Sequence, residues 1–284
     1  MKKVRIVTDT NSGISTEAAE SLGVSVVPMP FTIDGVSHLE NVTCTYEEFF
    51  KKLGMGADVV TSQPSPADIL ETWDGILNEY ESLVYLPMSS SLSSSYNTAE
   101  GLSKEYDGRV QVVDNRRISL SLYQSVLDAV RLAKYGMSAS EIKAILEREA
   151  SEQSIYITVN TLELLKKSGR VTKAGAALAT VLGLKPVLQI QGGKLDAFKK
   201  ARGMDKAKLI MLDAIKDDLA NRFNGINHQI AVAYSGTNTE EAEKWRKQVE
   251  EAFPGESVFM HPLPISICCH IGEGAMAVAV TKIL

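Results

Sequence analysis

The chain has 284 residues, of which 44 % are hydrophobic and 23 % are charged, a composition typical of a folded globular protein and not of a disordered chain. Lysine and arginine number 30 against 35 aspartates and glutamates, and this net charge of −5 excludes a general attraction for nucleic acid or anionic lipid. The three cysteines, Cys44, Cys268 and Cys269, are too few for a disulfide framework and lack the spacing of a zinc site.

The N-terminal sequence MKKVRIVTDT turns polar at Thr8, so it lacks the apolar region of a signal peptide. No apolar run in the chain approaches the roughly 18 residues needed to span a bilayer. From these features we expect a soluble, cytoplasmic protein that binds no metal ion and no nucleic acid.

The first half of the chain predicts strands that alternate with helices. Residues 4–7 form a β-branched strand, the polar turn TDTNSG follows, and a short helix ends at Gly23 before a strand at 24–30. Two later helices begin with capping boxes, Thr45 with Glu48 and Ser138 with Glu141. The remaining predicted elements are helices at 45–54, 65–80, 119–134 and 138–151 and strands at 83–86 and 110–113. This alternation predicts a parallel α/β sheet, whose ligands bind beyond the carboxyl ends of the strands.

The second half predicts a different sheet. Extended runs at 185–191 and 194–200 are joined by Gly192-Gly193, a hairpin signal that favours a mixed or antiparallel sheet. The other predicted elements are strands at 155–159, 229–234 and 257–263 and helices at 162–167, 175–182, 204–223 and 239–253. We therefore predict a two-domain α/β protein with a parallel α/β/α domain at 1–152 and a mixed α/β domain at 153–284.

Hydroxyl groups follow two predicted strands of the first domain. Six of the seven residues in SSSLSSS (89–95) are serines and come directly after the strand at 83–86, and Thr61-Ser62-Gln63-Pro64-Ser65 follows an extended run. Backbone N–H and side-chain O–H groups at such positions can hold an anion, and both segments should open on the same edge of the sheet. The alternative interpretation is a pair of solvated serine loops.

Three further positions are candidates for polar chemistry. His270 precedes Gly272 and Gly274, which would let the backbone approach a ligand, although His270 also fits a structural histidine. Arg170 lies in a short loop between helices, and Arg202 ends the basic run Lys199-Lys200-Ala201-Arg202; both also fit ordinary surface arginines. The sequence contains no phosphate-binding loop of the GxxxxGK[ST] type, no GxSxG elbow and no HExxH motif.

Several segments together resemble the DegV family of bacterial fatty-acid-binding proteins, which includes the lipid-carrying subunits of fatty acid kinase. They are VTDTNSGIS, TSQPSP, SSSLSSSYNTA, LELLKKSGRVTKAGAALATVLGLKPVLQIQGGKL and HIGEGAMAVAV, in that order along nearly the whole chain. The resemblance implies two α/β domains that enclose one acyl chain between them, with the apolar residues 175–188 and 274–280 as wall material or as ordinary core.

The resemblance also implies roles for particular residues. Thr61 and Ser93 would bind the fatty acid carboxyl group, Ser62 and Ser94 would assist through their backbone, and Arg170 and His270 would complete the polar network. Arg202 would contact the kinase subunit. The chain departs from the family pattern where Ser94 replaces a glycine, where the sequence reads His-Ile-Gly-Glu-Gly from His270 to Gly274 instead of His-Thr-Gly-Pro-Gly, and where residues 114–120 lack the usual small residues.

The function implied is that of a non-enzymatic carrier. It would bind one long-chain fatty acid as its ligand, without a cofactor, and present the carboxyl group to a separate ATP-dependent kinase that forms the acyl phosphate; transient contact with a membrane is compatible with this role. Two alternatives stay open: a serine-dependent lipid hydrolase or acyltransferase that uses Ser93 or Thr61 as nucleophile with His270, and a lipid-sensing regulatory protein.

Overall fold

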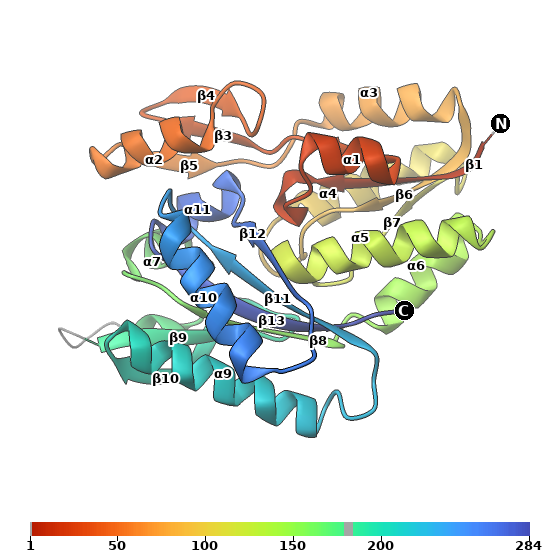
Figure 1. Ribbon diagram of the computed structural model, residues 1–284. Helices are drawn as coiled ribbons and strands as arrows, with labels where there is room; N and C mark the ends of the chain where they lie inside the picture. The colour runs from red at the N-terminus through yellow and green to blue at the C-terminus, as the bar shows by residue number, and fades with distance from the viewer. Residues whose placement is uncertain (1, 179–183) are drawn as a thin grey trace. The chain divides into compact units, whose positions relative to one another are not determined.

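The computed structural model describes residues 2–178 and 184–284 of the chain (Figure 1). It forms two compact units, each with its own sheet: unit 1 contains Met1–Cys44 and Val59–Ser151, and unit 2 contains Thr45–Asp58 and Glu152–Leu284. The sequence predicts one boundary, after residue 152. In the structure the chain also enters unit 2 at Thr45 and returns to unit 1 at Val59, because the segment between them packs with unit 2.

The main sheet of unit 1 is parallel throughout, with the strand order β2-β1-β6-β7. Its strands are β1 (Lys2–Asp9), β2 (Val24–Val27), β6 (Tyr80–Leu86) and β7 (Val110–Val112). The order reverses at β1, since β2 lies on one side of it and β6 on the other. In a doubly wound fold the carboxyl ends of the strands beside such a reversal are the usual place for a ligand. The structure confirms the predicted parallel sheet.

A second, smaller sheet in unit 1 was not predicted. It has the antiparallel order β4-β3-β5, and its strands are β3 (Pro30–Ile33), β4 (Val36–Leu39) and β5 (Val59–Thr61). The predicted strand at 24–30 is therefore divided: its first residues pair with β1, and from Pro30 the chain continues in the smaller sheet. Periodicity alone does not reveal this division, because both pieces are short and apolar.

The helices of unit 1 begin and end close to the predicted positions. Gly23 ends the first helix in the left-handed conformation (φ +69°), and Ser138 and Glu141 form the predicted capping box. The helices are α1 (Thr16–Leu22), α3 (Pro66–Leu77), α4 (Ser95–Ser103), α5 (Ser119–Lys134) and α6 (Ala139–Arg148), with short 3₁₀ turns η1 (Thr10–Ser12) and η2 (Lys104–Tyr106). Trp73 of α3 packs edge-on against Tyr85 of β6, with ring centroids 5.8 Å apart, in the core of this unit.

The sheet of unit 2 is mixed, as predicted, with the order β10-β9-β8-β13-β11-β12. β11 and β12 pair in parallel, and the other neighbouring pairs of this order are antiparallel. The strands are β8 (Gln153–Thr158), β9 (Leu184–Ile190), β10 (Asp196–Arg202), β11 (His228–Tyr234), β12 (Val258–Pro262) and β13 (Met276–Lys282). The sequence analysis did not assign β13 as a strand, although it is a central strand of this sheet.

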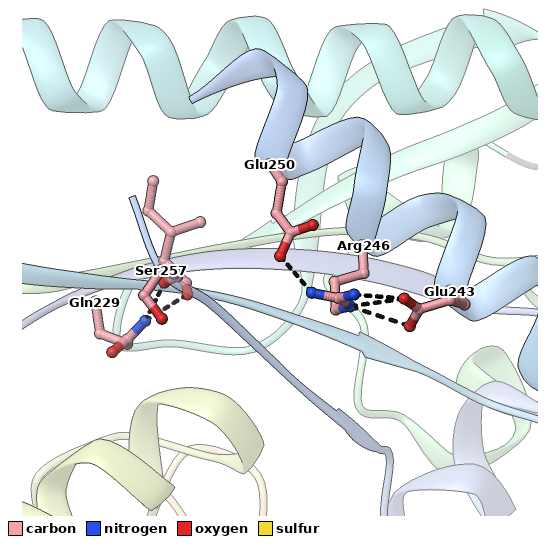
Figure 2. A network of polar contacts seen from close by, with 6 residues as sticks. Gln229, Glu243, Arg246, Glu250 and Ser257 are labelled. Carbon is pink, nitrogen blue, oxygen red and sulfur yellow. Dashed lines mark hydrogen bonds and ion pairs between the residues drawn. The ribbon is translucent and has the colours of Figure 1, made fainter. Parts of the chain in front are cut away.

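Two long helices of unit 2, α9 (Met204–Ala220) and α10 (Thr239–Ala252), pack their apolar sides on one face of the sheet (Figure 1). Trp245 of α10 is fully buried there, and its indole N–H donates to the carbonyl of Ala277, 2.9 Å away. Figure 2 shows Arg246 of α10 paired with Glu243 and Glu250 of the same helix. It also shows the side-chain amide of Gln229, which donates to the carbonyl of Ser257, 2.7 Å away. Solvent screens such partly exposed ion pairs, so they add little to the stability of the fold.

The remaining helices of unit 2 are α2 (Tyr46–Gly54), α7 (Glu163–Ser168), α8 (Lys173–Ala177) and α11 (Ile265–Ile271). The capping box predicted at Thr45 and Glu48 is present at α2. Of the predicted helix at 175–182, residues 179–182 lie outside the described residues. The predicted two-residue turn at Gly192-Gly193 is wrong: the strands of the hairpin end at Ile190 and begin again at Asp196, so the glycines lie inside a longer connection.

Candidate functional site

The carboxyl ends of β1 and β6 meet at the buried carboxyl group of Asp9. One oxygen accepts from the backbone N–H and the side-chain amide of Asn11, both at 3.0 Å, and the other accepts from the backbone N–H of Met88 at 2.9 Å. Asp9 is 0 % exposed. It therefore joins the end of β1 to the residues that follow β6, at the position where the strand order reverses.

Burial raises the pKa of Asp9 to about 6, more than its hydrogen bonds lower it, and the nearby carboxyl group of Glu40 raises it further. Glu40 is itself buried and accepts a 2.7 Å hydrogen bond from the hydroxyl of Thr10, which in turn accepts from the backbone N–H of Met29 at 3.1 Å. The end of β1 is thus a buried polar cluster whose acidic group titrates near neutrality. Sequence analysis described this segment only as a polar turn.

The serine-rich segment that follows β6 is held by the connection between β7 and α5. The backbone N–H of Ser89 donates to the carbonyl of Arg117 at 2.9 Å, and the hydroxyl of Ser90 donates to Asp114 at 2.7 Å. The carbonyl of Ser89 accepts from the backbone N–H groups of Leu92 (3.0 Å) and Ser93 (3.2 Å), which closes the segment into a compact turn. We call residues 89–95 the serine loop.

Ser93 and Ser94 stand at the start of α4. The Ser93 hydroxyl, which is half-buried, accepts from the backbone N–H of Ser95 at 3.2 Å and lies 2.8 Å from the Ser95 hydroxyl. Ser94 is exposed, occupies the N-cap position of α4 and makes no side-chain cap bond. A hydroxyl beside the positive end of the helix dipole is suited to an oxyanion.

Thr61 and Ser62 lie at the end of β5. The prediction that they open on the same edge of the parallel sheet as the serine loop is wrong. β5 belongs to the small antiparallel sheet, so its end is not on the carboxyl edge of the parallel sheet. Proximity has another cause: the Thr98 hydroxyl on α4 donates to the side-chain carbonyl of Gln63 at 3.1 Å. Through this contact, unit 1 brings the Thr61–Ser65 segment to the same helix that the serine loop begins.

Unit 2 brings His270 and Arg170 together. His270 lies on α11, which packs against α7, and Arg170 follows α7 in the loop before α8, where it also donates to the carbonyl of Ser168. Burial lowers the pKa of His270 to about 4, and the Arg170 guanidinium lowers it further. At neutral pH the imidazole is therefore uncharged and the local positive charge belongs to Arg170. This pair can offer a carboxylate one cation and one neutral hydrogen-bond donor.

The turn after His270 is fixed by Ser235 and Asn160. The Ser235 hydroxyl donates to the carbonyl of Gly272 (2.7 Å) and accepts from the N–H of Ala275 (2.9 Å), while the Ser235 carbonyl accepts from the N–H of Gly274 (2.8 Å). The Asn160 amide donates to the carbonyl of Glu273 at 2.9 Å. Neither residue could be recognised from the sequence, because their partners are more than 30 positions away.

The glycines of this turn are required by the protein's own backbone. Gly274 has φ +81°, and a β-carbon there would lie 2.0 Å from the Asn160 amide nitrogen. Gly272 has φ +71°, and a β-carbon would come within 3.4 Å of Leu164. Both positions therefore require glycine for conformation, and Gly274 also requires it for packing.

Arg202 is exposed at the end of β10, the edge strand of the unit 2 sheet. Lys199 and Lys200 on the same strand are also exposed. This strand therefore presents a basic edge to solvent, as the interpretation of a solvated face predicts, and charge on an edge strand opposes pairing with other strands.

Among residues 2–178 and 184–284, no helix combines the length and apolar character needed to cross a membrane. Within the same ranges, no group of three or more His, Cys, Asp and Glu side chains is arranged to hold a metal ion.

Comparison with known proteins relates the whole chain to one family. Residues 3–282 match the family model described as "Uncharacterised protein, DegV family". A DegV domain-containing protein of Staphylococcus aureus strain N315 is 29 % identical over 283 residues, which cover 99 % of this chain and 100 % of that protein.

Solved structures share the fold. One is the structure of a fatty-acid-binding DegV family protein from Thermus thermophilus, with a TM-score of 0.89 and 32 % identity. The match covers 99 % of this chain and 100 % of that protein. A stearic acid-binding protein from Eubacterium ventriosum has a TM-score of 0.88, with 98 % of each chain covered, and its 23 % identity shows likeness of fold alone.

Proposed function

This chain belongs to the DegV family, and from that premise we propose that it binds one long-chain fatty acid. The observation that carries the proposal is the end-to-end similarity to the Thermus thermophilus protein, with a TM-score of 0.89 and 32 % identity. The carboxyl group would be bound by the hydroxyls of Thr61 and Ser93, assisted by the backbone at Ser62 and Ser94, and by Arg170 and His270.

The chemistry of these residues suits a carboxylate. A carboxylate removed from water without partners is costly, so its oxygens must receive hydrogen bonds. The start of α4 carries the Ser93 hydroxyl and the positive end of a helix dipole, and unit 2 supplies the Arg170 cation beside a His270 imidazole that stays neutral at pH 7. The neutral imidazole can donate one hydrogen bond without adding a second buried charge.

The apolar chain of the ligand would supply most of the affinity. Burial of about 14 methylene groups at 0.8 kcal/mol each corresponds to roughly 11 kcal/mol before the costs of ordering and desolvation. Those costs are several kcal/mol, so tight binding requires a preformed apolar channel.

The first experiment is native mass spectrometry of the purified chain, which should show one co-purified acyl chain for each protein. A protein that carries no lipid and also takes up no added palmitate would overturn the proposal. Ser93→Ala should weaken palmitate binding about tenfold, with an unchanged thermal midpoint, since one charge-assisted hydrogen bond is lost.

Ser103→Ala is the matched control for Ser93→Ala. Ser103 ends the same helix, and its hydroxyl donates only to the carbonyl of Glu100, at 2.9 Å. Equal loss of binding in the two variants would show that α4, and not the Ser93 hydroxyl, is responsible.

We further propose that a separate ATP-dependent fatty acid kinase phosphorylates the bound carboxyl group, with Arg202 on the basic edge of β10 as a contact for that kinase. Acyl phosphate should form when the palmitate-loaded chain is mixed with the ATP-binding subunit of a bacterial fatty acid kinase and ATP. Arg202→Ala should lower the rate without changing palmitate affinity. Lys134→Ala, which removes an equally exposed charge at the end of α5, should leave the rate unchanged.

The alternatives give different results in the same experiments. A serine hydrolase or acyltransferase would be labelled covalently by a fluorophosphonate at Ser93 or Thr61. A lipid-sensing regulator would retain palmitate but support no acyl phosphate formation.

A further inference from the structure

Between the end of β7 and the first turn of α5, two residues have a backbone conformation that glycine normally adopts. Arg116 has φ +52° and Ser119 has φ +50°. In this region the β-carbon of an L-residue crowds the neighbouring carbonyl, so both positions carry local strain. Strained residues of this kind persist only where the surrounding contacts enforce them, and they concentrate at functional sites.

The contacts that enforce this conformation converge on Arg117. Its side chain is only 3 % exposed, and its guanidinium donates to the Ser125 hydroxyl (3.0 Å) and to the carbonyl of Glu149 (2.7 Å). Its backbone N–H donates to the Asn115 side chain at 3.2 Å. A buried arginine tied to two helical segments thus fixes the residue that lies between the two strained positions.

The backbone carbonyl of Arg117 holds the serine loop. Its carbonyl accepts from the N–H of Ser89, 2.9 Å away, and the carbonyl of Ser89 accepts from the N–H of Ser93, 3.2 Å away. Asp114, at the start of the same connection, binds both the N–H (3.3 Å) and the hydroxyl (2.7 Å) of Ser90. Only one residue therefore lies between the carbonyl of Arg117 and the backbone of Ser93.

We infer that the left-handed backbone at Arg116 and Ser119 positions the serine loop, so that the Ser93 hydroxyl and the start of α4 are preorganised for an oxyanion. The strain is the cost of directing the Arg117 carbonyl at Ser89 while its side chain stays anchored in the core. The part of this inference that concerns the ligand rests on the proposed fatty acid binding. Arg116 and Ser119 act here as positioning residues and make no contact with the ligand themselves.

The test compares Arg116→Gly with Arg116→Ala. The Arg116 side chain is 60 % exposed and makes one long contact, 4.0 Å, with Asp114. Both substitutions remove that contact, so the two variants differ only in backbone freedom. Arg116→Gly should have a thermal midpoint about 2 °C higher than Arg116→Ala, because glycine relieves the strain.

At the serine loop, Arg116→Gly should perform worse than Arg116→Ala, although it is the more stable variant. Hydrogen exchange at the Ser89 amide should be about tenfold faster in Arg116→Gly, and palmitate should bind about fivefold more weakly, whereas Arg116→Ala should match the wild type in both. This opposition between stability and binding is not expected of a residue that only supports the fold. Ser119→Gly and Ser119→Ala form a second, independent pair with the same expected pattern.

The measurements separate failure of this inference from failure of the proposed function. Equal exchange at Ser89 and equal palmitate affinity in the glycine and alanine variants would overturn the inference. If wild-type protein takes up no palmitate, the proposed function fails, and the exchange measurement still decides whether the strained backbone positions the loop.

Discussion

Unit 1 buries the carboxyl group of Asp9 where a parallel strand ends, whereas unit 2 buries the imidazoles of His261 and His270. Burial raises the pKa of Asp9 to about 6 and lowers the pKa of each histidine to about 4. The physical cause is the same in both units, because a low dielectric disfavours the charged form of any group. At neutral pH the outcome differs: Asp9 is mostly ionised and stabilised by donors, and both histidines are neutral.

The two units also hold their polar segments in different ways. In unit 1, the Asp114 carboxylate and a strained connection hold the serine loop. In unit 2, Ser235 and Asn160 hold a turn that contains glycines. The connection in unit 1 has non-glycine residues in the left-handed region, and the turn in unit 2 has glycines there. Substitution in the two segments should therefore change stability differently.

The largest effect is expected from Asp9→Ala in unit 1. The change leaves the N–H groups of Met88 and Asn11 buried without their acceptor, so we expect a loss of about 4 kcal/mol in the free energy of unfolding. Urea denaturation monitored by circular dichroism measures it. Asp74→Ala, which removes an exposed hydrogen bond to Tyr106, should cost less than about 1 kcal/mol. Similar losses in the two variants would contradict the role assigned to Asp9.

In unit 2 the corresponding test is Gly274→Ala. The new β-carbon would meet the Asn160 amide and adopt an unfavourable φ of +81°, so we expect a loss of about 3 kcal/mol. Gly35→Ala is the control in unit 1, since Gly35 has a similar φ of +79° with no atom within 4 Å of the added carbon. It should cost about 1 kcal/mol, the conformational part alone. Equal costs, again from urea denaturation, would show that the Asn160 contact is unimportant.

The pH dependence of stability should have opposite signs in the two units. Unfolded histidine binds a proton near pH 6.5 and folded His261 only near pH 4, so neutral His261 contributes stability above pH 6.5 that is lost as the pH falls towards 4. Between pH 6.5 and 5 this loss amounts to about 2 kcal/mol. His261→Asn, which keeps a donor for the carbonyl of Pro262, should remove it.

For Asp9 the sign reverses. Folded Asp9 binds its proton near pH 6 and the unfolded chain near pH 3.8, so the protonated group contributes stability below pH 3.8 that is lost as the pH rises through 6. Asp9→Asn should remove this dependence. The test is the urea midpoint of wild type and of both variants from pH 4 to pH 7. For each variant, the difference in midpoint from wild type should change with pH, and the two changes should have opposite signs. Changes of equal sign would contradict the contrast.

The sequence was most informative where the controlling interactions are local. The capping boxes at Thr45 and Ser138 and the helix-ending Gly23 depend on residues within one turn, and all three are present in the structure. The parallel and mixed sheets also followed from the alternation of strands and helices. The DegV family followed from short motifs in a fixed order, and the match over residues 3–282 confirms it.

Long-range pairing was the source of the errors. β5 was expected beside the parallel sheet but pairs with β3, and the central strand β13 was not assigned. The segment from Thr45 to Asp58 reads as part of the first domain, yet Tyr46 accepts a hydrogen bond from the N–H of Gly236 in unit 2 at 3.3 Å. Periodicity within a window of residues contains no information about such partners.

The helices with their caps, most strands, the hydroxyl-rich loops and the family could be predicted from the sequence, because each depends on neighbouring residues or on motif order. The tertiary structure alone decided which strands pair, which side chains fix the serine loop and the turn after His270, and which buried groups carry charge at neutral pH. These features depend on desolvation and on hydrogen bonds between distant residues, and both exist only once the chain has folded.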